Sequence, residues 1–374
     1  MFLGLSASGA QLLGPRVNPT NAAYFDFRIA CQSREHHLIQ WSQDLTNWAT
    51  YQHSLSTLTN RPVQVPMSVG PRAFWRTVLT NEPMFPYALI ARRSINFSNF
   101  NIATDSFDST DPAHSLNGMY DPSRRLGHGD IAISGSEANP VWLDKVTVRG
   151  VLHVASNVSV SLRNGSVGDL AFVDDPVNAG LIQTNHFRED AGYLFLPDVT
   201  LPPNIPWVAL VPAPSRTNVD GVDYAYVLPT GDYRVDGWSW SESTLITGNV
   251  RIWVTSAIDF IGNDQVHIAP NGSLQVFASC SNVRFGGQGI VNDTGRALNF
   301  LYFGTSQNTS LVLGANGLII GAFYAPAATV TLRGNGNPLE FSDFVGSIAA
   351  DRIDFQAPHA FHYDEALATQ GPMK

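Results

Sequence analysis

From Phe85 onward the chain is a series of short apolar strands separated by Gly and Asn corners, and this pattern constrains the fold more than any other feature. Val250–Val254, Leu274–Phe277 and Thr329–Leu332 are examples of the strands, and Gly248-Asn249 is one of the corners. Such strands recur roughly every 10 residues. They are too short to be stable as isolated hairpins, but they suit coils that stack along an axis and bury their inward faces on one another. We therefore predict an irregular right-handed parallel β-helix over residues 83–374.

One part of this region departs from the pattern. The stretch 164–226 holds Pro197, Pro202-Pro203, Pro206, Pro212 and Pro214. Proline removes a hydrogen bond from a sheet and is kept out of central strands. We predict that this stretch leaves the helix as a Pro-rich excursion and returns near Tyr226. Because loops often carry function, a functional surface is expected there or on the loops that face it.

The first 82 residues form a different compositional unit, with alternating apolar and polar residues. The alternation is typical of half-buried strands. About five to seven short strands in a segment of this size predict a small β-sandwich-like module. The expected strands are Tyr24–Ala30, His37–Ser42, Arg61–Pro66 and Ala73–Val78. The whole chain is thus predicted to be all-β, with a module over 1–82, a linker at Asn81–Pro83 and a β-helix domain over 83–374.

Composition excludes several classes of protein. The net charge of −9 provides no basic surface for nucleic acid. A run of 18 apolar residues is absent from the sequence, so no transmembrane segment is expected. Cys31 and Cys280 are the only cysteines, and they form no CxxC motif. The first residues, Met1–Ala10, lack a basic stretch and do not make a clear signal peptide.

The acidic run Asp105, Asp108 and Asp111 is a weak candidate for a metal site. Carboxylate oxygens are ligands that Ca²⁺ prefers. The run lacks the twelve-residue EF-hand loop and the nine-residue Gly/Asp repeat of known Ca²⁺-binding sequences. The alternative is that Asp and Ser side chains satisfy backbone groups at turns.

A second weak metal candidate lies near the C-terminus. His359 and His362 are three residues apart, with Asp364 and Glu365 beside them. Imidazole and carboxylate groups bind zinc and related metals, but this spacing alone does not define a ligand geometry. The alternative is an end-cap, in which polar side chains close the last coil and cover an open sheet edge.

The carboxylates Asp174, Asp175 and Asp190, with His186 and Arg188, indicate a polysaccharide-cleaving site as an alternative to a non-enzymatic protein. Glycoside hydrolysis requires two carboxyl groups about 5–10 Å apart across the scissile bond. These residues lie in the irregular stretch, where charged side chains are usually solvated. No residue is predicted to be catalytic or to bind a cofactor.

Two aromatic pairs, Trp238/Trp240 and Phe323/Tyr324, offer ring faces on which sugars stack. Alternate aromatic residues in a strand are more often divided between core and surface. The pairs therefore leave a glycan-binding role open without locating it.

Several segments resemble, in order, an uncharacterised β-helical family of bacterial surface proteins whose domain is often found in PilX-like type IV pilus-assembly proteins. The matching segments are Tyr87–Ala91, Thr104–Ser109, Leu228–Tyr233, Gly321–Ala327, Phe344–Ala349 and Phe361–Leu367. The last resembles the family's terminal H-Y-D-E-x-L motif nearly residue for residue. The family's N-terminal pilin-like helix has no counterpart here. The resemblance implies a β-helix and no established enzymatic activity.

The N-terminal module resembles a short repeat of secreted proteins of environmental bacteria. The matching residues are Ser42–Trp48 and Arg72–Arg76. Together the resemblances imply a structural or adhesive protein, extracellular or on the bacterial cell surface, whose partner is a glycan or a surface protein. The runner-up is a carbohydrate-active β-helix enzyme. A third hypothesis, a scaffold whose coils stack end to end, requires an uncapped terminus, and the expected cap at Phe361–Leu367 argues against it.

Overall fold

The computed structural model describes seven strands within residues 1–82, and residues 83–373 except 98–99, 136, 138–140, 157, 192–193, 195, 212–215, 240–242, 263, 316–317 and 335–340. The chain divides into two compact units. The first holds Met1–Glu82, Tyr193–Phe195 and Met373–Lys374, and the second holds Pro83–Gly192 and Leu196–Pro372. Both are mostly β, so the predicted all-β class is confirmed.

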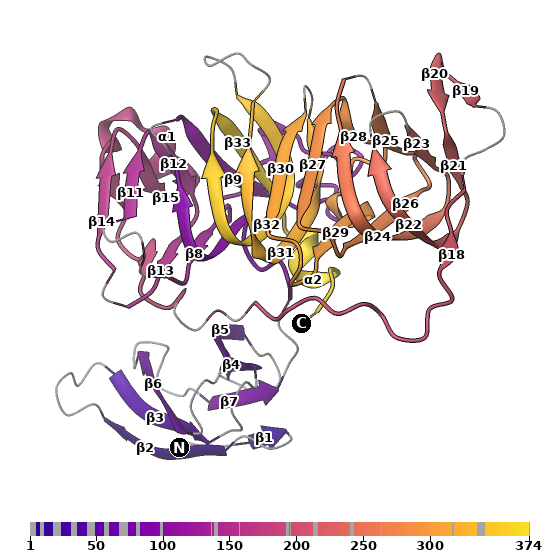
Figure 1. Ribbon diagram of the computed structural model, residues 1–374. Helices are drawn as coiled ribbons and strands as arrows, with labels where there is room; N and C mark the ends of the chain where they lie inside the picture. Colours follow the sequence, from indigo (N-terminus) through magenta and orange to yellow (C-terminus); the bar gives the residue numbers. More distant parts are fainter. Residues whose placement is uncertain are drawn as a thin grey trace. The chain divides into compact units, whose positions relative to one another are not determined.

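The first unit contains two sheets (Figure 1). One has the strand order β1-β7-β4-β5, with β1 parallel to β7 and the other pairs antiparallel, and the second is the antiparallel sheet β2-β3-β6. The strands are β1 (Leu5–Ala7), β2 (Gln11–Val17), β3 (Tyr24–Ala30), β4 (His36–Ser42), β5 (Ala49–Leu55), β6 (Asn60–Pro66) and β7 (Phe74–Leu79). The four strands predicted here are confirmed, whereas β1, β2 and β5 were not predicted. Most of the module's motif, residues 43–48 and 72–73, lies outside the described residues.

The second unit is a long series of strands with two short α-helices, α1 (Leu170–Asp174) and α2 (Ala366–Thr369). Its first strands are β8 (Leu89–Asn96), β9 (Ile102–Phe107), β10 (Ile131–Ile133), β11 (Val141–Asp144), β12 (Val146–Arg149), β13 (Leu152–Val154), β14 (Val160–Arg163), β15 (Ser166–Gly168), β16 (Leu181–Ile182), β17 (Phe187–Arg188), β18 (Val208–Ala209), β19 (Thr217–Val219) and β20 (Val222–Tyr224). The later strands are β21 (Tyr226–Leu228), β22 (Gly231–Ser239), β23 (Thr244–Ile246), β24 (Asn249–Phe260), β25 (Gln265–Ile268), β26 (Ser273–Ala278), β27 (Asn282–Gly287), β28 (Gly289–Asn292), β29 (Phe300–Gly304), β30 (Ser310–Ala315), β31 (Ile319–Leu332), β32 (Ser342–Phe355) and β33 (His359–Asp364).

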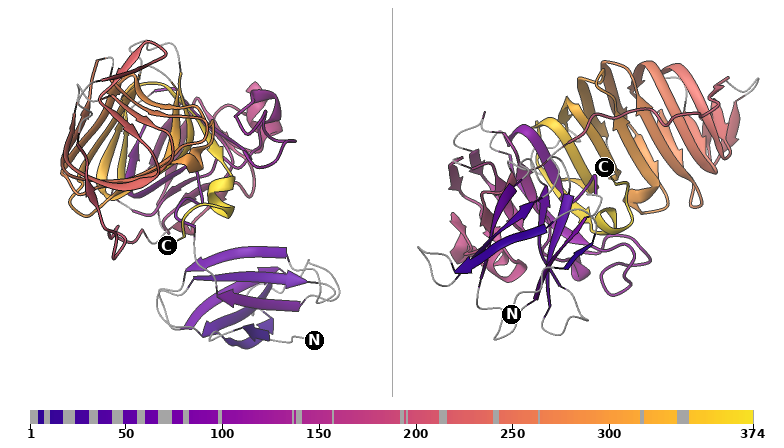
Figure 2. Two further views of the ribbon diagram at one scale, coloured as in Figure 1. Left: turned by 90° about the vertical axis from the view of Figure 1, so that its right-hand side faces the viewer. Right: turned by 90° about the horizontal axis from the view of Figure 1, so that it is seen from below.

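These strands pair in parallel with strands one circuit further along the chain. Val250 in β24 pairs with Leu274 in β26, which pairs with Phe300 in β29. A second ladder runs through β24, β27 and β30, and a third through β21, β23, β25 and β28. Long strands such as β31 contribute to more than one ladder. The chain therefore winds as stacked parallel coils, and we name residues 83–191 and 216–372 the coil stack (Figures 1 and 2).

The two ends of the coil stack in sequence meet in its interior. Strand β8 pairs with β32 on one side and with β10 on the other: Leu89 is in register with both Ile348 and Ile131. Likewise β9 lies between β33 and β12. Along the stack, the coils therefore run from β21 to β33, and then from β8 to β17. We name the β32/β33–β8/β9 contact the junction.

This order corrects the predicted end-cap. Strand β33 is the last strand of the chain but not the last of the stack, because β9 pairs along its full length, from His359 with Ile102 to Asp364 with Phe107. His359 and His362 thus cover no open edge. The earlier objection to end-to-end stacking, which relied on this cap, no longer applies.

The Pro-rich excursion is shorter than predicted. Part of the stretch 164–226 remains in the coil stack, since β15 pairs with β12 and β16, and β17 pairs with β13. Residues 196–209, which we name the strap, run along the outside of the stack toward β18, which pairs with β22 (Figure 1). The strap contacts the stack at two places. The Tyr324 hydroxyl donates a hydrogen bond of 2.9 Å to the Pro197 carbonyl, and the ring centroids of Trp207 and Trp253 are 5.9 Å apart.

The interior of the stack is filled by aromatic and aliphatic side chains in successive coils. Phe260 and Phe285 stack with ring centroids 6.1 Å apart, and Phe344 and Phe361 at 4.8 Å, and all four are fully buried. Each such side chain contributes about 1.5–3 kcal/mol by burial. Within the described part of the chain, no helix has the length and apolar character needed to span a bilayer.

Candidate functional site

The most concentrated polar cluster that includes predicted site residues lies at the junction. Strand β9 carries Asp105 and β33 carries His362, and the register of the two strands places these residues opposite each other. Both are buried, with 3% and 8% of their surface exposed. Asp105 and His362 come from separate metal hypotheses, and the fold brings them together across most of the second unit.

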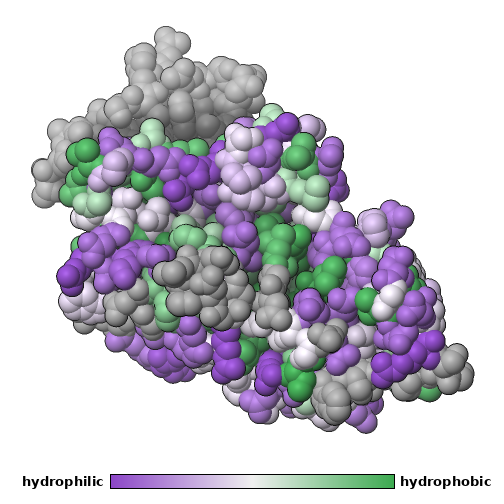
Figure 3. All heavy atoms as spheres, turned by 90° about the horizontal axis from the view of Figure 1, so that it is seen from above, coloured by the Kyte–Doolittle hydropathy of each residue, from purple (hydrophilic) through white to green (hydrophobic). Residues whose placement is uncertain are grey.

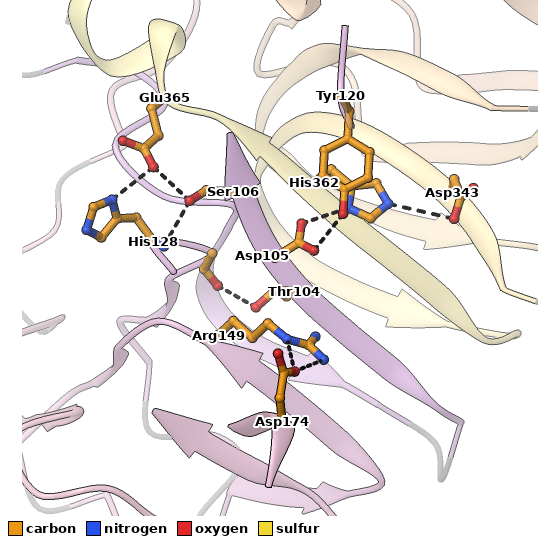
Figure 4. A network of polar contacts seen from close by, with 11 residues as sticks. Thr104, Asp105, Ser106, Tyr120, His128, Arg149, Asp174, Asp343, His362 and Glu365 are labelled. Atoms are coloured by element: carbon orange, nitrogen blue, oxygen red, sulfur yellow. Dashed lines mark hydrogen bonds and ion pairs between the residues drawn. The ribbon is translucent and has the colours of Figure 1, made fainter. Parts of the chain in front are cut away.

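His362 and Asp105 form a buried ion pair that two further side chains extend (Figure 4). His362 Nδ1 lies 2.7 Å from Asp105 Oδ1, and the Tyr120 hydroxyl donates to Asp105 Oδ2 at 2.8 Å. The Tyr120 ring stacks on the imidazole with centroids 3.6 Å apart, and Asp343 lies 3.7 Å from Nε2. Asp105 thus has a partner at each carboxylate oxygen.

Protonation at this cluster follows from its charges. Burial lowers the pKa of His362, but the carboxylates of Asp105 and Asp343 outweigh burial, and the net effect is a raised pKa. Burial, followed by the negative charge of Asp105, raises the pKa of Tyr120. The arrangement therefore favours a protonated imidazole between carboxylates and a neutral phenol. These charges link β9 to β33, the strands that meet at the junction.

A neighbouring set of bonds reinforces the junction. The Ser106 hydroxyl donates to Glu365 Oε1 at 2.7 Å, and His128 Nδ1 lies 2.9 Å from the same oxygen. The hydrogen bond to Glu365 raises the pKa of His128. The Tyr363 hydroxyl donates to the Phe85 carbonyl at 2.7 Å. The first and last coils are therefore linked by side chains as well as by strand pairing.

Asp108 and Asp111 do not converge on Asp105. Asp108 Oδ1 accepts hydrogen bonds from the Thr110 amide and hydroxyl at 2.8 and 2.6 Å, and Asp111 Oδ1 accepts one from the Ala113 amide at 2.8 Å. These are turn contacts, as the alternative interpretation expected. Arg124 lies in the same loop, and its Nη1 donates to the Pro112 and Ser115 carbonyls at 2.6 Å.

The second metal candidate is also divided by the fold. His359 Nδ1 lies 2.9 Å from the Ala357 carbonyl, and burial lowers the pKa of this histidine. Residues three apart in a strand point to opposite faces, so His359 and His362 face different surroundings. Among the described residues, no group of three or more His, Cys, Asp or Glu side chains is arranged to hold a metal ion.

The carboxylates considered for an enzyme each have their own partners. Asp174 pairs with Arg125 and Arg149, and Asp175 accepts the Val177 amide at the start of a short helical turn. Asp190 Oδ1 lies 2.7 Å from His153 Nδ1. Of the remaining two, His186 Nδ1 lies 2.9 Å from the Gly150 carbonyl. Arg188 lies on β17. Burial raises the pKa of Asp190, but the hydrogen bond and charge of His153, followed by the charge of Arg188, outweigh burial and lower this pKa.

His153 is buried in a cluster that was not predicted. Its ring stacks on Tyr87 with centroids 4.6 Å apart, and Asp130 Oδ2 lies 3.6 Å from Nε2, an ion-pair distance beyond a hydrogen bond. Burial lowers the pKa of His153, yet Asp130 and Asp190 together raise it to about 9. No motif joins these residues in sequence, because they come from separate coils.

A second unpredicted cluster joins β25 of the third ladder to Tyr224 on β20 and to Asp293, which follows β28. The Tyr224 hydroxyl lies 2.7 Å from His267 Nδ1, and His267 Nε2 lies 2.6 Å from Asp293 Oδ2. Gln265 Nε2 donates to the same hydroxyl at 3.0 Å. The cluster is internally satisfied and ties adjacent coils together.

Three of the four aromatic residues considered for sugar stacking lie in the interior. Trp238 is fully buried and its Nε1 donates to Thr244, while Phe323 and Tyr324 are also fully buried. Trp240 lies outside the described residues. Trp238, Phe323 and Tyr324 therefore offer no ring face to a ligand.

Residues 213–370 match the family model described as "Domain of unknown function (DUF7305)". The match includes His362 but neither Asp105 nor Tyr120, which lie in the first coils. No match was found among curated proteins or among solved structures. The comparison thus identifies the later coils as a recognisable domain and assigns them no function.

Proposed function

We propose that this chain is a non-enzymatic structural or adhesive protein, extracellular or on the bacterial cell surface, in which residues 83–372 form an irregular right-handed parallel β-helix and the first unit a small β-sandwich-like module. The observation that carries this proposal is the junction, where β8 and β9 continue the ladders of β32 and β33. A stack whose chain ends are built into its interior is hard to open from either end. Such a body suits rigid display of a binding surface.

The polar side chains of these clusters are bonded to one another, and this supports a structural role. Asp105 and His362 form an ion pair that Tyr120 extends, and Tyr224, His267 and Asp293 are in polar contact with one another. A hydrolase needs two carboxyl groups that face one another across the substrate. Asp174 and Asp190 are instead engaged by protein cations and Asp175 by a backbone amide, and this favours the non-enzymatic hypothesis over a carbohydrate-active enzyme.

The location rests on the resemblances to bacterial surface and secreted proteins. An attachment to type IV pili stays a prediction from the PilX-associated family, since the matched domain carries no functional description. Low charge, 14% of residues, and abundant tight corners also fit a compact body that resists proteolysis.

A binding and turnover assay on the full chain tests the proposal. We would incubate the protein with a panel of neutral and acidic polysaccharides and measure binding together with new reducing ends and unsaturated products. We expect binding to at least one polymer and no product formation. Product that disappears in Asp174→Asn or Asp190→Asn would instead establish the carbohydrate-active enzyme.

A further inference from the structure

The two-stranded parallel sheet of β11 and β14 carries an exposed tryptophan. Trp142 is 66% exposed, although its neighbours Val141 and Leu143 are fully buried. The strand alternates as expected for a sheet with one face in the core. On the face shown in Figure 3, hydrophobic residues lie scattered among hydrophilic ones, and single exposed apolar groups of this kind are normal. Trp142 differs from them because its flat ring is held on a packed strand.

The register of the sheet surrounds this ring with polar groups. Trp142 pairs with Ser161 and Asp144 pairs with Arg163. Register partners point to the same face, and adjacent strands lie about 4.8 Å apart, so these four side chains share the outer face. Lys145 follows at the corner with a φ of 59° and is exposed. We name these five residues the Trp142 patch.

The charges of the patch are unevenly satisfied. Asp144 Oδ1 accepts a hydrogen bond of 3.1 Å from Asn164. In contrast, no ion pair of Arg163 or Lys145 is found in the described part of the chain, whereas Arg149 and Arg251 are each paired with a carboxylate. The only negative charge of the patch is Asp144, opposite Arg163, so with Arg163 and Lys145 the patch carries a net charge of +1 on a protein of net charge −9. A cationic surface beside an open aromatic ring forms a local site for one anionic group.

We propose that the Trp142 patch binds a uronic-acid residue of an acidic polysaccharide. The apolar face of the sugar ring stacks on the Trp142 indole, and the carboxylate is held by the Arg163 guanidinium and the Lys145 ammonium. Ser161 and the remaining Asp144 oxygen hydrogen-bond sugar hydroxyl groups. This inference rests on the adhesive role proposed above and names its surface and ligand class.

Other partners fit the patch less well. A nucleic acid would need a run of cations along its backbone, and the chain has no such run. A neutral glycan would leave both cations unused. An acidic sugar uses the ring, the cations and the hydroxyl-binding groups together.

The test measures binding of the full chain to alginate and polygalacturonate, with dextran and single-stranded DNA as comparisons, by isothermal calorimetry near 0.15 M salt, where distant charges are screened beyond about 8 Å. We expect uronate binding that Trp142→Ala weakens at least tenfold and Trp142→Phe weakens less. Arg163→Gln should weaken it severalfold and reduce its salt dependence. The matched controls Leu181→Ala and Arg284→Gln, at other exposed positions, should change it less than twofold.

The outcomes separate this inference from the proposed function. If the wild type binds uronates and Trp142→Ala binds equally well, the patch is wrong and the adhesive role stands. If the wild type binds dextran or DNA as tightly as uronates, the ligand class is wrong. If the wild type binds none of the polymers of the wider panel, both the adhesive role and the Trp142 patch as a binding site are wrong. Circular dichroism of each variant establishes that the fold is retained.

Discussion

Replacing Asp105 by Asn should weaken the junction more than any other single change of one charge there. The substitution preserves the size of the side chain but removes the negative charge that bonds His362 at 2.7 Å and Tyr120 at 2.8 Å. Hydrogen bonds to a charged group contribute about 1.5–3 kcal/mol, and breaking a buried ion pair costs about 3–5 kcal/mol. Because His362 can lose its proton in the variant, we expect the free energy of unfolding to fall by about 3 kcal/mol, the lower end of the range for a broken buried ion pair.

The matched control is Asp343→Asn. Asp343 contacts the same imidazole, at 3.7 Å, but its side chain is 56% exposed. Exposed pairs contribute about 0–1 kcal/mol. Urea unfolding of the full chain, with hydrogen exchange read at the amides of β9 and β33, measures both variants. Losses that agree within about 0.5 kcal/mol would refute the argument that burial makes Asp105 the dominant partner.

The same pair predicts a pH dependence. The pKa of His362 is raised in the folded protein, so its protonation stabilises the fold fully below the unfolded value of about 6.5. This contribution is lost as the pH rises through the folded pKa. The difference in unfolding free energy between wild type and Asp105→Asn should therefore be larger at pH 6 than at pH 9. An equal difference at both values would contradict an ion pair.

Three further predictions concern other parts of the coil stack. His153→Gln should lower the free energy of unfolding by about 3 kcal/mol at pH 6, since the pKa of His153 is raised from 6.5 to about 9 and each pKa unit corresponds to about 1.4 kcal/mol. In urea unfolding this loss of stability should vanish at a pH above the raised pKa. Tyr324→Phe removes a bond to the strap, worth about 1 kcal/mol, and should speed proteolysis within residues 196–209 without changing exchange in β31. Gly346→Ala should lower the thermal midpoint strongly, because φ is +132° and a Cβ would overlap the Gly321 carbonyl, whereas Gly237→Ala meets open space and should not.

The strand pattern was readable from the sequence because it depends on local chemistry. Strand β3 and the first residues of β24, which contain Val250–Val254, were predicted from alternation and corners alone. The order of the coils was not readable, since nothing local indicates that β8 pairs with β32. Placing Phe361–Leu367 at an end assumed that the last strand of the chain is the last strand of the stack. The junction overturned that assumption.

The candidate site was predicted only in part for the same reason. Asp105 and His362 were singled out by residue type, but their partnership depends on a pairing across the whole unit. Tyr120 and His153 carried no signal, because one lies in an irregular loop and the other in a short buried strand. Residue type identifies groups capable of ionic contacts, whereas only the fold decides which of them meet.

The position of the junction also changes what the ends of the stack are. They are formed by internal segments, β14, β16 and β17 at one end and β18, β21 and β22 at the other. All of these strands except β22 hold two to four residues, and short edge strands offer few free backbone groups to a second copy. Strand β22 holds nine residues, of which β18 pairs with Tyr233 and Arg234, so end-to-end pairing is restricted mainly at the end formed by β14, β16 and β17, and not by a terminal cap. The coil stack is left to present its sides, and the Trp142 patch lies on one of them.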